Sequence, residues 1–254
     1  MINEMGTAHF FEHLVFKGSR LLSKAKLENY AENTASLMNA YTSREQTAYY
    51  FQGRKDETSQ LIKLLADMVQ NPSLDRGAIM QERYVIDAEF SDILNNAQEV
   101  IFDFIHAFCY GGIDGKFGQS SLSYNILGTR HHISKLITQQ MIKDFIHVHY
   151  HPSRMVLVAT GAVADHEEIV ELAKQYFTRS DSYVGPGTPT FERQARPLKN
   201  DPYLDFWGET KFNPCEIRYH FVGADTVSGS IVFPTVGWSH SDSLTMMLVS
   251  QMIG

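Results

Sequence analysis

Two histidines and a glutamate lie close together near the start of the chain, in the segment His9-Phe10-Phe11-Glu12-His13. On an α-helix, side chains four residues apart lie on the same face, so His9 and His13 can direct their imidazoles at one ion. Two neutral imidazoles at this spacing suit zinc. Glu12 borders the same face, where its carboxylate can take a proton from a water that zinc activates. The segment therefore predicts a hydrolytic metal site with Glu12 as general base.

Two histidines leave a catalytic zinc site one protein ligand short, and a long helix expected further along the chain carries three candidates. These are Glu82, Asp87 and Glu89. Glu82 and Glu89 are separated by two helical turns, so both can face the same direction. Spacing alone does not choose among the three carboxylates, each of which could also be a solvated surface group.

The composition excludes several classes of protein. The chain has 254 residues, of which 43% are hydrophobic and 20% charged, as is usual for a soluble globular protein. Its net charge of −7 argues against nucleic-acid binding. No apolar run is long enough to cross a bilayer, and residues 1–5 resemble neither a signal peptide nor a transit segment. The two cysteines, Cys109 and Cys215, are too few for a disulfide framework, which fits a reducing or matrix-like compartment.

The periodicity of apolar residues predicts an irregular alternation of helices and strands. Thr7 is the expected N-cap of the helix that carries the motif. The predicted helices cover residues 8–17, 24–34, 58–70, 75–97 with a continuation through 108, 138–147, 166–177 and 243–253. The predicted strands lie within 39–52, turning near 43–46, and at 155–161, 216–221 and 229–237, and residues 111–128 form a loop. This order favours an α+β fold in which helices cover one face of a mixed or antiparallel sheet.

The chain divides into two parts of unequal length. Residues 179–204 contain four prolines and little apolar periodicity, so we interpret them as a linker between a first domain at 1–178 and the start of a similar second domain at 205–254. The motif helix begins within the first ten residues, and the chain stops inside the last predicted helix. We therefore expect a sequence that is truncated at both ends.

Six segments together resemble the pitrilysin-type zinc peptidases, whose His-x-x-Glu-His order is that of the inverzincins. The resemblance spans nearly the whole chain and is strongest for the branch of catalytic β-type subunits that process mitochondrial precursors. It implies a LuxS/MPP-like metallohydrolase fold, built as a repeated two-domain unit. The segments that carry it are 6–19, 37–50, 82–86, 99–107, 149–157 and 236–240.

The resemblance also assigns roles to individual residues. It implies that Glu89, 76 residues after His13, is the third zinc ligand and that Glu82 orients the site. Asn39, Ala40 and Tyr41 match an edge strand to which the family binds extended peptides through main-chain hydrogen bonds.

Two further acidic residues match the positions at which the family binds an arginine that lies two residues before the cleaved bond. Glu99 and Asp103 are four residues apart, so on a helix their carboxylates can hold one guanidinium. The implied protein is a zinc endopeptidase with one Zn²⁺ per site that removes presequences from precursors in the mitochondrial matrix. The implied partner is an α-type subunit whose glycine-rich loop helps to handle the substrate.

Departures from the family leave two alternatives open. Asp87-Ala88 replaces a Leu-Arg pair, residues 205–230 diverge, and the catalytic groups of the family's C-terminal half are not assigned. We therefore expect the chain alone to bind zinc poorly or to cleave poorly. The alternatives are a structural core subunit of the cytochrome bc complex, whose metal motif is often eroded, and a general peptide-degrading peptidase of the same fold. The intact metal motif argues against the first, and the Glu99/Asp103 pair argues against the second.

Overall fold

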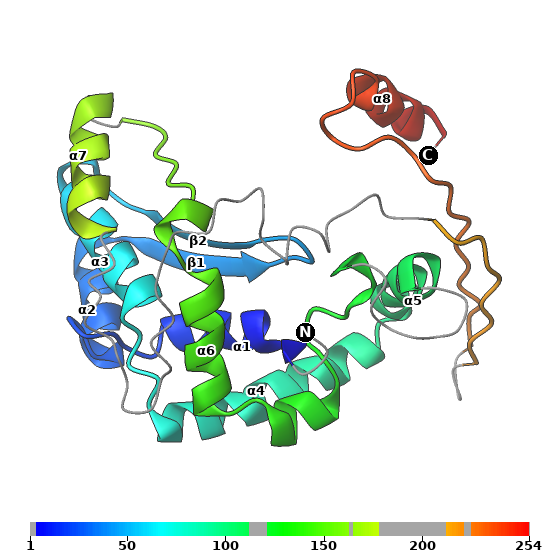
Figure 1. Ribbon diagram of the computed structural model, residues 1–254, viewed down its shortest axis with the longest axis horizontal. Coiled ribbons are helices and arrows are strands. Elements are labelled where there is room, and N and C mark those ends of the chain that lie inside the picture. Colours follow the sequence, from blue (N-terminus) through cyan, green and yellow to red (C-terminus); the bar gives the residue numbers. More distant parts are fainter. Residues whose placement is uncertain (1–3, 112–120, 163–164, 178–211, 221–224, 254) are drawn as a thin grey trace.

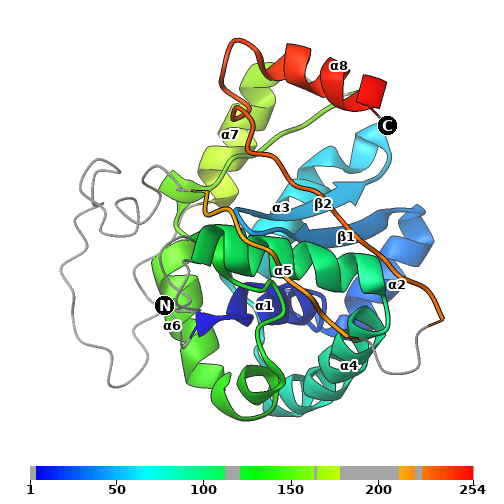
Figure 2. The same ribbon diagram turned by 90° about the vertical axis from the view of Figure 1, so that its right-hand side faces the viewer.

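A short buried helix lies at the centre of the computed structural model, which describes residues 4–111, 121–162, 165–177, 212–220 and 225–253. This helix, α1, lies beneath a two-stranded hairpin, β1–β2, and packs against α4 and α6 (Figure 1). The second view shows the same layering, with α5 in front of α1 (Figure 2). The bounds are α1 (Thr7–Val15), β1 (Leu37–Thr42), β2 (Thr47–Gln52), α4 (Arg76–Leu94), α5 (Ala97–Gly111) and α6 (Gln139–His149).

The apolar residues of α1 form the middle of the hydrophobic core. Phe10, Phe11, Leu14 and Val15 are each at most 1% exposed. They pack with buried side chains of α4 and α6 and of the turn before α6. Close packing of this kind holds a helix in place, so the backbone of α1 positions its histidines rigidly.

The start of α1 depends on backbone geometry rather than on a capping side chain. The expectation that Thr7 caps the helix is wrong, because Gly6 is the N-cap and Thr7 is the first helical residue, with a fully buried side chain. Gly6 has φ of +82°, and a Cβ placed there would lie 2.3 Å from the carbonyl oxygen of Leu127. Only glycine fits both conditions, so the loop through Leu127 can approach the metal motif closely.

The remaining helices follow the sequence predictions closely. Helices α2 (Lys24–Thr34), α3 (Thr58–Gln70) and α8 (Ser243–Ile253) have the predicted bounds, and α7 (His166–Tyr176) ends one residue early. The long helix is interrupted between α4 and α5, because Asn95 ends α4 and the side chain of Asn96 accepts hydrogen bonds from the first amides of α5. Short turns of 3₁₀ or π-helix lie at 55–57, 121–123, 132–136 and 152–154.

The sheet is smaller than the sequence predicts. Among the described residues it consists of β1 and β2 alone, antiparallel, with Ala40 opposite Tyr49. The strands predicted at 155–161 and 229–237, and the described part of the one at 216–221, are not formed. A strand exists through hydrogen bonds to a neighbour, and these segments have no strand partner in the described chain. The run at 155–161 is also not buried, since Val156 is 88% exposed.

Two other sequence interpretations fall partly or wholly outside the described residues. The linker at 179–204 lies outside them, as does most of the first half of the loop at 111–128. Of the helices in the described ranges, none combines the length and the apolar composition that a bilayer-spanning segment requires.

Candidate metal centre

Three of the predicted ligands meet above α1. His9 and His13 lie one turn apart on α1, and α4 crosses so that the carboxylate of Glu89 faces both imidazoles. One ligand atom from each residue lies within 4.8 Å of the others. His9 Nε2 is 3.4 Å from Glu89 Oε1, and His13 Nε2 is 3.3 Å from Glu89 Oε2. The residues therefore converge on one point from two helices.

These separations fit the chemistry of the donor set. Ligands that bind a tetrahedral zinc at about 2.0–2.1 Å lie about 3.3 Å from one another. The two nitrogen–oxygen distances between the histidines and Glu89 are close to this separation between ligands. Two imidazoles and one carboxylate are also a known donor set of catalytic zinc, with the fourth position left for water or substrate. The residues present thus fit a zinc ion.

Glu82 lies behind the cluster and holds one of its members. Its Oε2 is 3.2 Å from Nδ1 of His13, on the side of the ring opposite to Glu89, and its Oε1 is 2.6 Å from Nζ of Lys17. The Glu82 side chain is only 5% exposed. A carboxylate that receives Nδ1–H fixes the orientation and tautomer of a metal-binding histidine. Glu82 is thus placed to present Nε2 of His13 to the ion.

The charges within the cluster stabilise one another. Burial alone would lower the pKa of His13, but its contacts with Glu89 and Glu82 raise that pKa above the ordinary value. In turn, the contacts with His13 and His9 lower the pKa of Glu89 to about 2. A carboxylate ionised this readily is suited to a position beside a cation.

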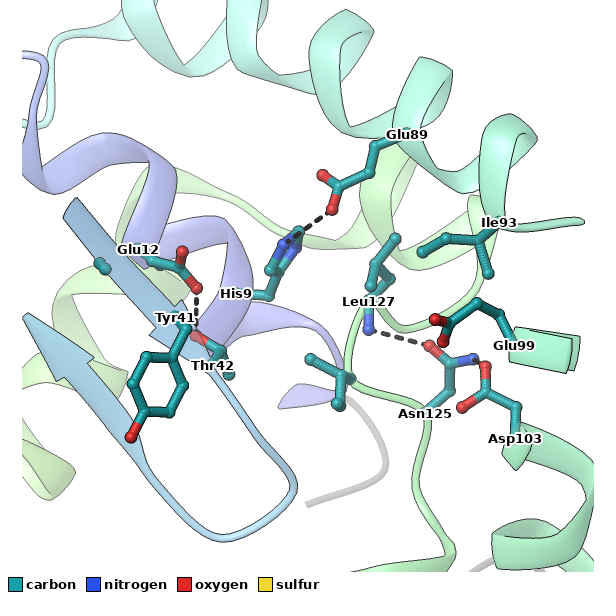
Figure 3. Close-up of a pocket in the computed structure, with 12 residues that line it drawn as sticks. His9, Glu12, Tyr41, Thr42, Glu89, Ile93, Glu99, Asp103, Asn125 and Leu127 are labelled. Atoms are coloured by element: carbon teal, nitrogen blue, oxygen red, sulfur yellow. Dashed lines mark hydrogen bonds and ion pairs between the residues drawn. The ribbon is translucent and has the colours of Figure 1, made fainter. Parts of the chain in front are cut away.

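Glu12 faces the cleft from α1 and is held by the hairpin. Its Oε2 accepts a hydrogen bond of 2.5 Å from the hydroxyl of Thr42, the last residue of β1 (Figure 3). Thr42 shares with Ala40 and Met38 the half-buried face of β1, and Met38 packs against the core that contains α1. Glu12 does not belong to the ligand cluster. Its carboxylate is therefore oriented but remains available to accept a proton.

One cleft of about 280 Å³ is lined by two of the three metal donors, by Glu12 and by the acidic pair of α5. Ala40 and Tyr41 of β1 line it, whereas Asn39, on the same strand, does not. The edge of β1 that faces away from β2 has no strand partner in the part of the chain that the structure describes. The cleft residues are His9, Glu12, Ala40, Tyr41, Thr42, Glu89, Ile93, Glu99, Asp103, Asn125, Ile126 and Leu127.

The acidic pair on α5 lines the same cleft, but its two members differ. Asp103 is paired with Arg44, whose Nη2 lies 2.5 Å from Oδ1, and it also accepts a hydrogen bond from Asn125. Burial raises the pKa of Asp103 despite Arg44, and burial lowers the pKa of Arg44 despite Asp103. The carboxylate of Glu99 has no such partner among the described residues. The sequence prediction therefore missed three residues that hold the acidic groups, namely Thr42, Arg44 and Asn125.

Comparison with known protein families covers almost all of the chain. The family model described as "Insulinase (Peptidase family M16)" matches residues 2–114, which include every metal and acidic residue named above. The model described as "Peptidase M16 inactive domain" matches residues 136–254.

Several curated proteins are similar over 98% of the chain. "Mitochondrial-processing peptidase subunit beta" of Bos taurus is 36% identical over 249 residues, and its counterpart in Caenorhabditis elegans is 34% identical over 249. "Probable mitochondrial-processing peptidase subunit beta" of Schizosaccharomyces pombe is 34% identical over 250 residues. The matches cover 46%, 48% and 50% of these proteins, so the chain spans about half the length of the curated relatives it matches.

A solved structure described as a protease from Helicobacter pylori shares the fold. The two superpose with a TM-score of 0.60 at 22% sequence identity, over 70% of this chain and 41% of that one. The likeness supports the overall fold.

Proposed function

The chain belongs to peptidase family M16, a family of metallopeptidases, and we propose that it is a zinc endopeptidase that removes targeting presequences from imported mitochondrial precursors. One observation carries the proposal. The cleft that contains the metal donors His9 and Glu89 is also lined by the acidic residues of α5. A peptidase that acts on basic presequences needs both features within the length of a few peptide residues.

Each residue of the cleft has a proposed task. His9, His13 and Glu89 would hold zinc, and zinc when bound would lower the pKa of water and polarise the scissile carbonyl. Glu12 accepts the proton of the attacking water and later gives it to the leaving amine, while Thr42 keeps its carboxylate in place. The edge of β1 that faces away from β2 would bind the peptide as an added strand. Such binding uses main-chain hydrogen bonds and therefore tolerates many substrate sequences.

Charged residues of the cleft would recognise one side chain of the substrate. We propose that an arginine near the cleaved bond is met by the acidic residues of α5, since carboxylates bind guanidinium groups through charge-assisted hydrogen bonds. We further propose the mitochondrial matrix as the location and an α-type subunit as the partner, because the relatives of similar sequence are named β subunits of the mitochondrial processing peptidase.

The substrate preference is tested with two peptides that differ at a single residue. One is a presequence peptide with arginine two residues before the expected cut, and the other has citrulline, its neutral isostere, at that position. With an α-type subunit present, we expect the protein to cleave the arginine peptide with the higher kcat/KM. Absence of cleavage of both peptides would contradict the proposal, and equal cleavage of both would point to a general peptidase.

Replacing Glu99 by glutamine should remove most of that preference. The substitution keeps the size of the side chain and removes the charge that faces the cleft, so the ratio of kcat/KM for the arginine peptide to that for the citrulline peptide should fall about tenfold. Glu171→Gln is the matched control, because Glu171 is an exposed glutamate of α7 that pairs with Lys174. An unchanged ratio in the Glu99 variant would show that another group reads the arginine.

Glu82→Gln should weaken zinc binding without removing a ligand. The variant loses the charged acceptor of His13 Nδ1 and the partner of Lys17, and such losses lower metal affinity by about 10–100-fold. Zinc affinity is measured by competition with a chromophoric chelator. Asp87→Asn on the same helix, where Asp87 is exposed and pairs with Arg130, should leave the affinity unchanged. Equal affinities in both variants would exclude the orienting role of Glu82.

A further inference from the structure

A buried arginine lies between the peptide-binding hairpin and the acidic helix of the cleft. Arg44 occupies the turn between β1 and β2, which is closed by a 2.8 Å hydrogen bond from Ser43 N–H to the carbonyl of Gln46. Although this turn is at the surface, the Arg44 side chain is only 8% exposed. It points at α5 and at the loop before Leu127 rather than into solvent. A cation so placed has a partner that keeps it there.

That partner is Asp103, and each oxygen of its carboxylate already accepts a hydrogen bond. Oδ1 of Asp103 accepts from Nη2 of Arg44 at 2.5 Å, and Oδ2 accepts from the side-chain amide of Asn125, also at 2.5 Å. Asn125 is held in turn, because its Oδ1 accepts the backbone N–H of Leu127 at 2.8 Å. Arg44 also approaches the carbonyl of Tyr124 at 3.5 Å. A substrate guanidinium would have to share both oxygens of Asp103 with these donors or displace them, and breaking an ion pair whose arginine is buried is strongly unfavourable.

The other carboxylate of the pair is in a different situation. Glu99 lies one helical turn before Asp103 and lines the same cleft, and it is exposed. Among the described residues, no cation contacts its carboxylate. Figure 3 shows Glu99 and Asp103 side by side, with Asn125 bonded to Asp103 and not to Glu99. With two carboxylates and one guanidinium, the group has a net charge of −1 at neutral pH.

We propose that Arg44 is a positioning residue that determines specificity. It holds Asp103 in the wall of the cleft, so that Glu99 alone binds the basic side chain of a bound peptide. The inference rests on the proposed function and changes one part of it, because the two acidic residues no longer act as an equivalent clamp. Arg44 also lowers the negative charge of the cleft, and therefore limits how strongly a basic residue is preferred.

The test uses the arginine and citrulline peptides with three variants of the protein, assembled with its α-type partner. Arg44→Gln removes the positive charge and releases Asp103, so the preference for arginine should rise about fivefold. Asp103→Asn leaves Arg44 without its counter-charge beside the cleft, so the preference should fall by a similar factor. The double variant Arg44→Gln/Asp103→Asn keeps the net charge of −1 and keeps Glu99, so its preference should stay within about twofold of the unmodified protein.

The double variant distinguishes this proposal from the alternative in which Asp103 binds the substrate arginine directly. If Asp103 bound the substrate arginine itself, the double variant would lose preference as the single Asp103 variant does, and that result would overturn the proposal. The comparison uses a ratio of two peptides on one enzyme, so a partial loss of folded protein cancels. Arg54→Gln is the control, since Arg54 follows the same hairpin but is exposed and pairs with Asp56 at 2.7 Å.

A second readout does not depend on peptidase activity. Urea unfolding of the same three variants forms a double-mutant cycle, and we expect the effects of Arg44→Gln and Asp103→Asn on stability to be clearly non-additive, because the two side chains contact each other. Additive effects would contradict the pairing itself. If neither peptide were cleaved, the proposed function would fail, and this cycle would still decide whether Arg44 holds Asp103.

Discussion

Replacing Glu12 by glutamine is expected to lower the turnover number by about 10²–10⁴-fold, the range that a positioned general base contributes. The amide keeps the shape of the side chain and can still bond to the hydroxyl of Thr42, but it cannot accept a proton. Because Glu12 lies outside the cluster formed by His9, His13 and Glu89, the variant should bind zinc as the unmodified protein does. Turnover of a presequence peptide and the zinc content of the same sample give the answer.

The matched control for this variant is Glu28→Gln. Glu28 is an exposed glutamate of α2 that pairs with Lys24, so its substitution should change neither turnover nor zinc content. Loss of zinc together with turnover in the Glu12 variant would mean that Glu12 supports the metal rather than the proton transfer. Retained turnover would rule out Glu12 as the base.

Replacing Glu89 by glutamine should have the largest effect on the metal. Glu89 is the only carboxylate of the described cluster, and it bridges the two histidines at 3.3 and 3.4 Å. A neutral amide removes a charged ligand, so we expect the zinc affinity to fall by more than the 10–100-fold that the loss of an outer partner costs. Calorimetric titration of zinc into metal-free protein measures this affinity directly.

Comparing the zinc affinities of Glu89→Gln and Glu82→Gln shows which of the two carboxylates binds the metal. Both residues lie on α4 and both contact His13, one at Nε2 and the other at Nδ1. If Glu89 is the ligand and Glu82 its support, the Glu89 variant binds zinc more weakly than the Glu82 variant. The reverse order would move the metal to the other side of the His13 ring.

Helix positions were predictable from the sequence because they depend on local signals. The bounds of α2, α3 and α8 follow from apolar periodicity and from stop signals such as Asn71-Pro72. The start of α1 was not predictable in this way. Thr7 has the right residue type for a cap, but the close approach of Leu127 requires the positive φ of Gly6, and that approach is a tertiary contact.

Strands were predicted less well because a strand depends on a partner elsewhere in the chain. The hairpin β1–β2 carries its partner within a few residues and was found, with its turn at Ser43–Gln46. The apolar run at 155–161 has the composition of a buried strand, yet pairing is a property of two segments, and periodicity describes only one.

The candidate site also has residues that local spacing predicts and residues that depend on tertiary contacts. The spacing of His9 and His13 placed two imidazoles on one helical face, but spacing could not choose between Glu82 and Glu89, and the family resemblance was needed for that choice. Arg44 was missed altogether. An arginine between Ser43 and Glu45 in a surface turn has the pattern of a solvated charge, and its partner Asp103 is 59 residues away. Only the folded arrangement brings the two together.

The proposed function is tested most directly by mass spectrometry of the products from a presequence peptide incubated with the zinc-loaded protein and an α-type subunit. We expect one cut, with an arginine two residues before it, that disappears when zinc is chelated and is absent with Glu12→Gln. No cut, or a cut that survives both treatments, would contradict the proposed function.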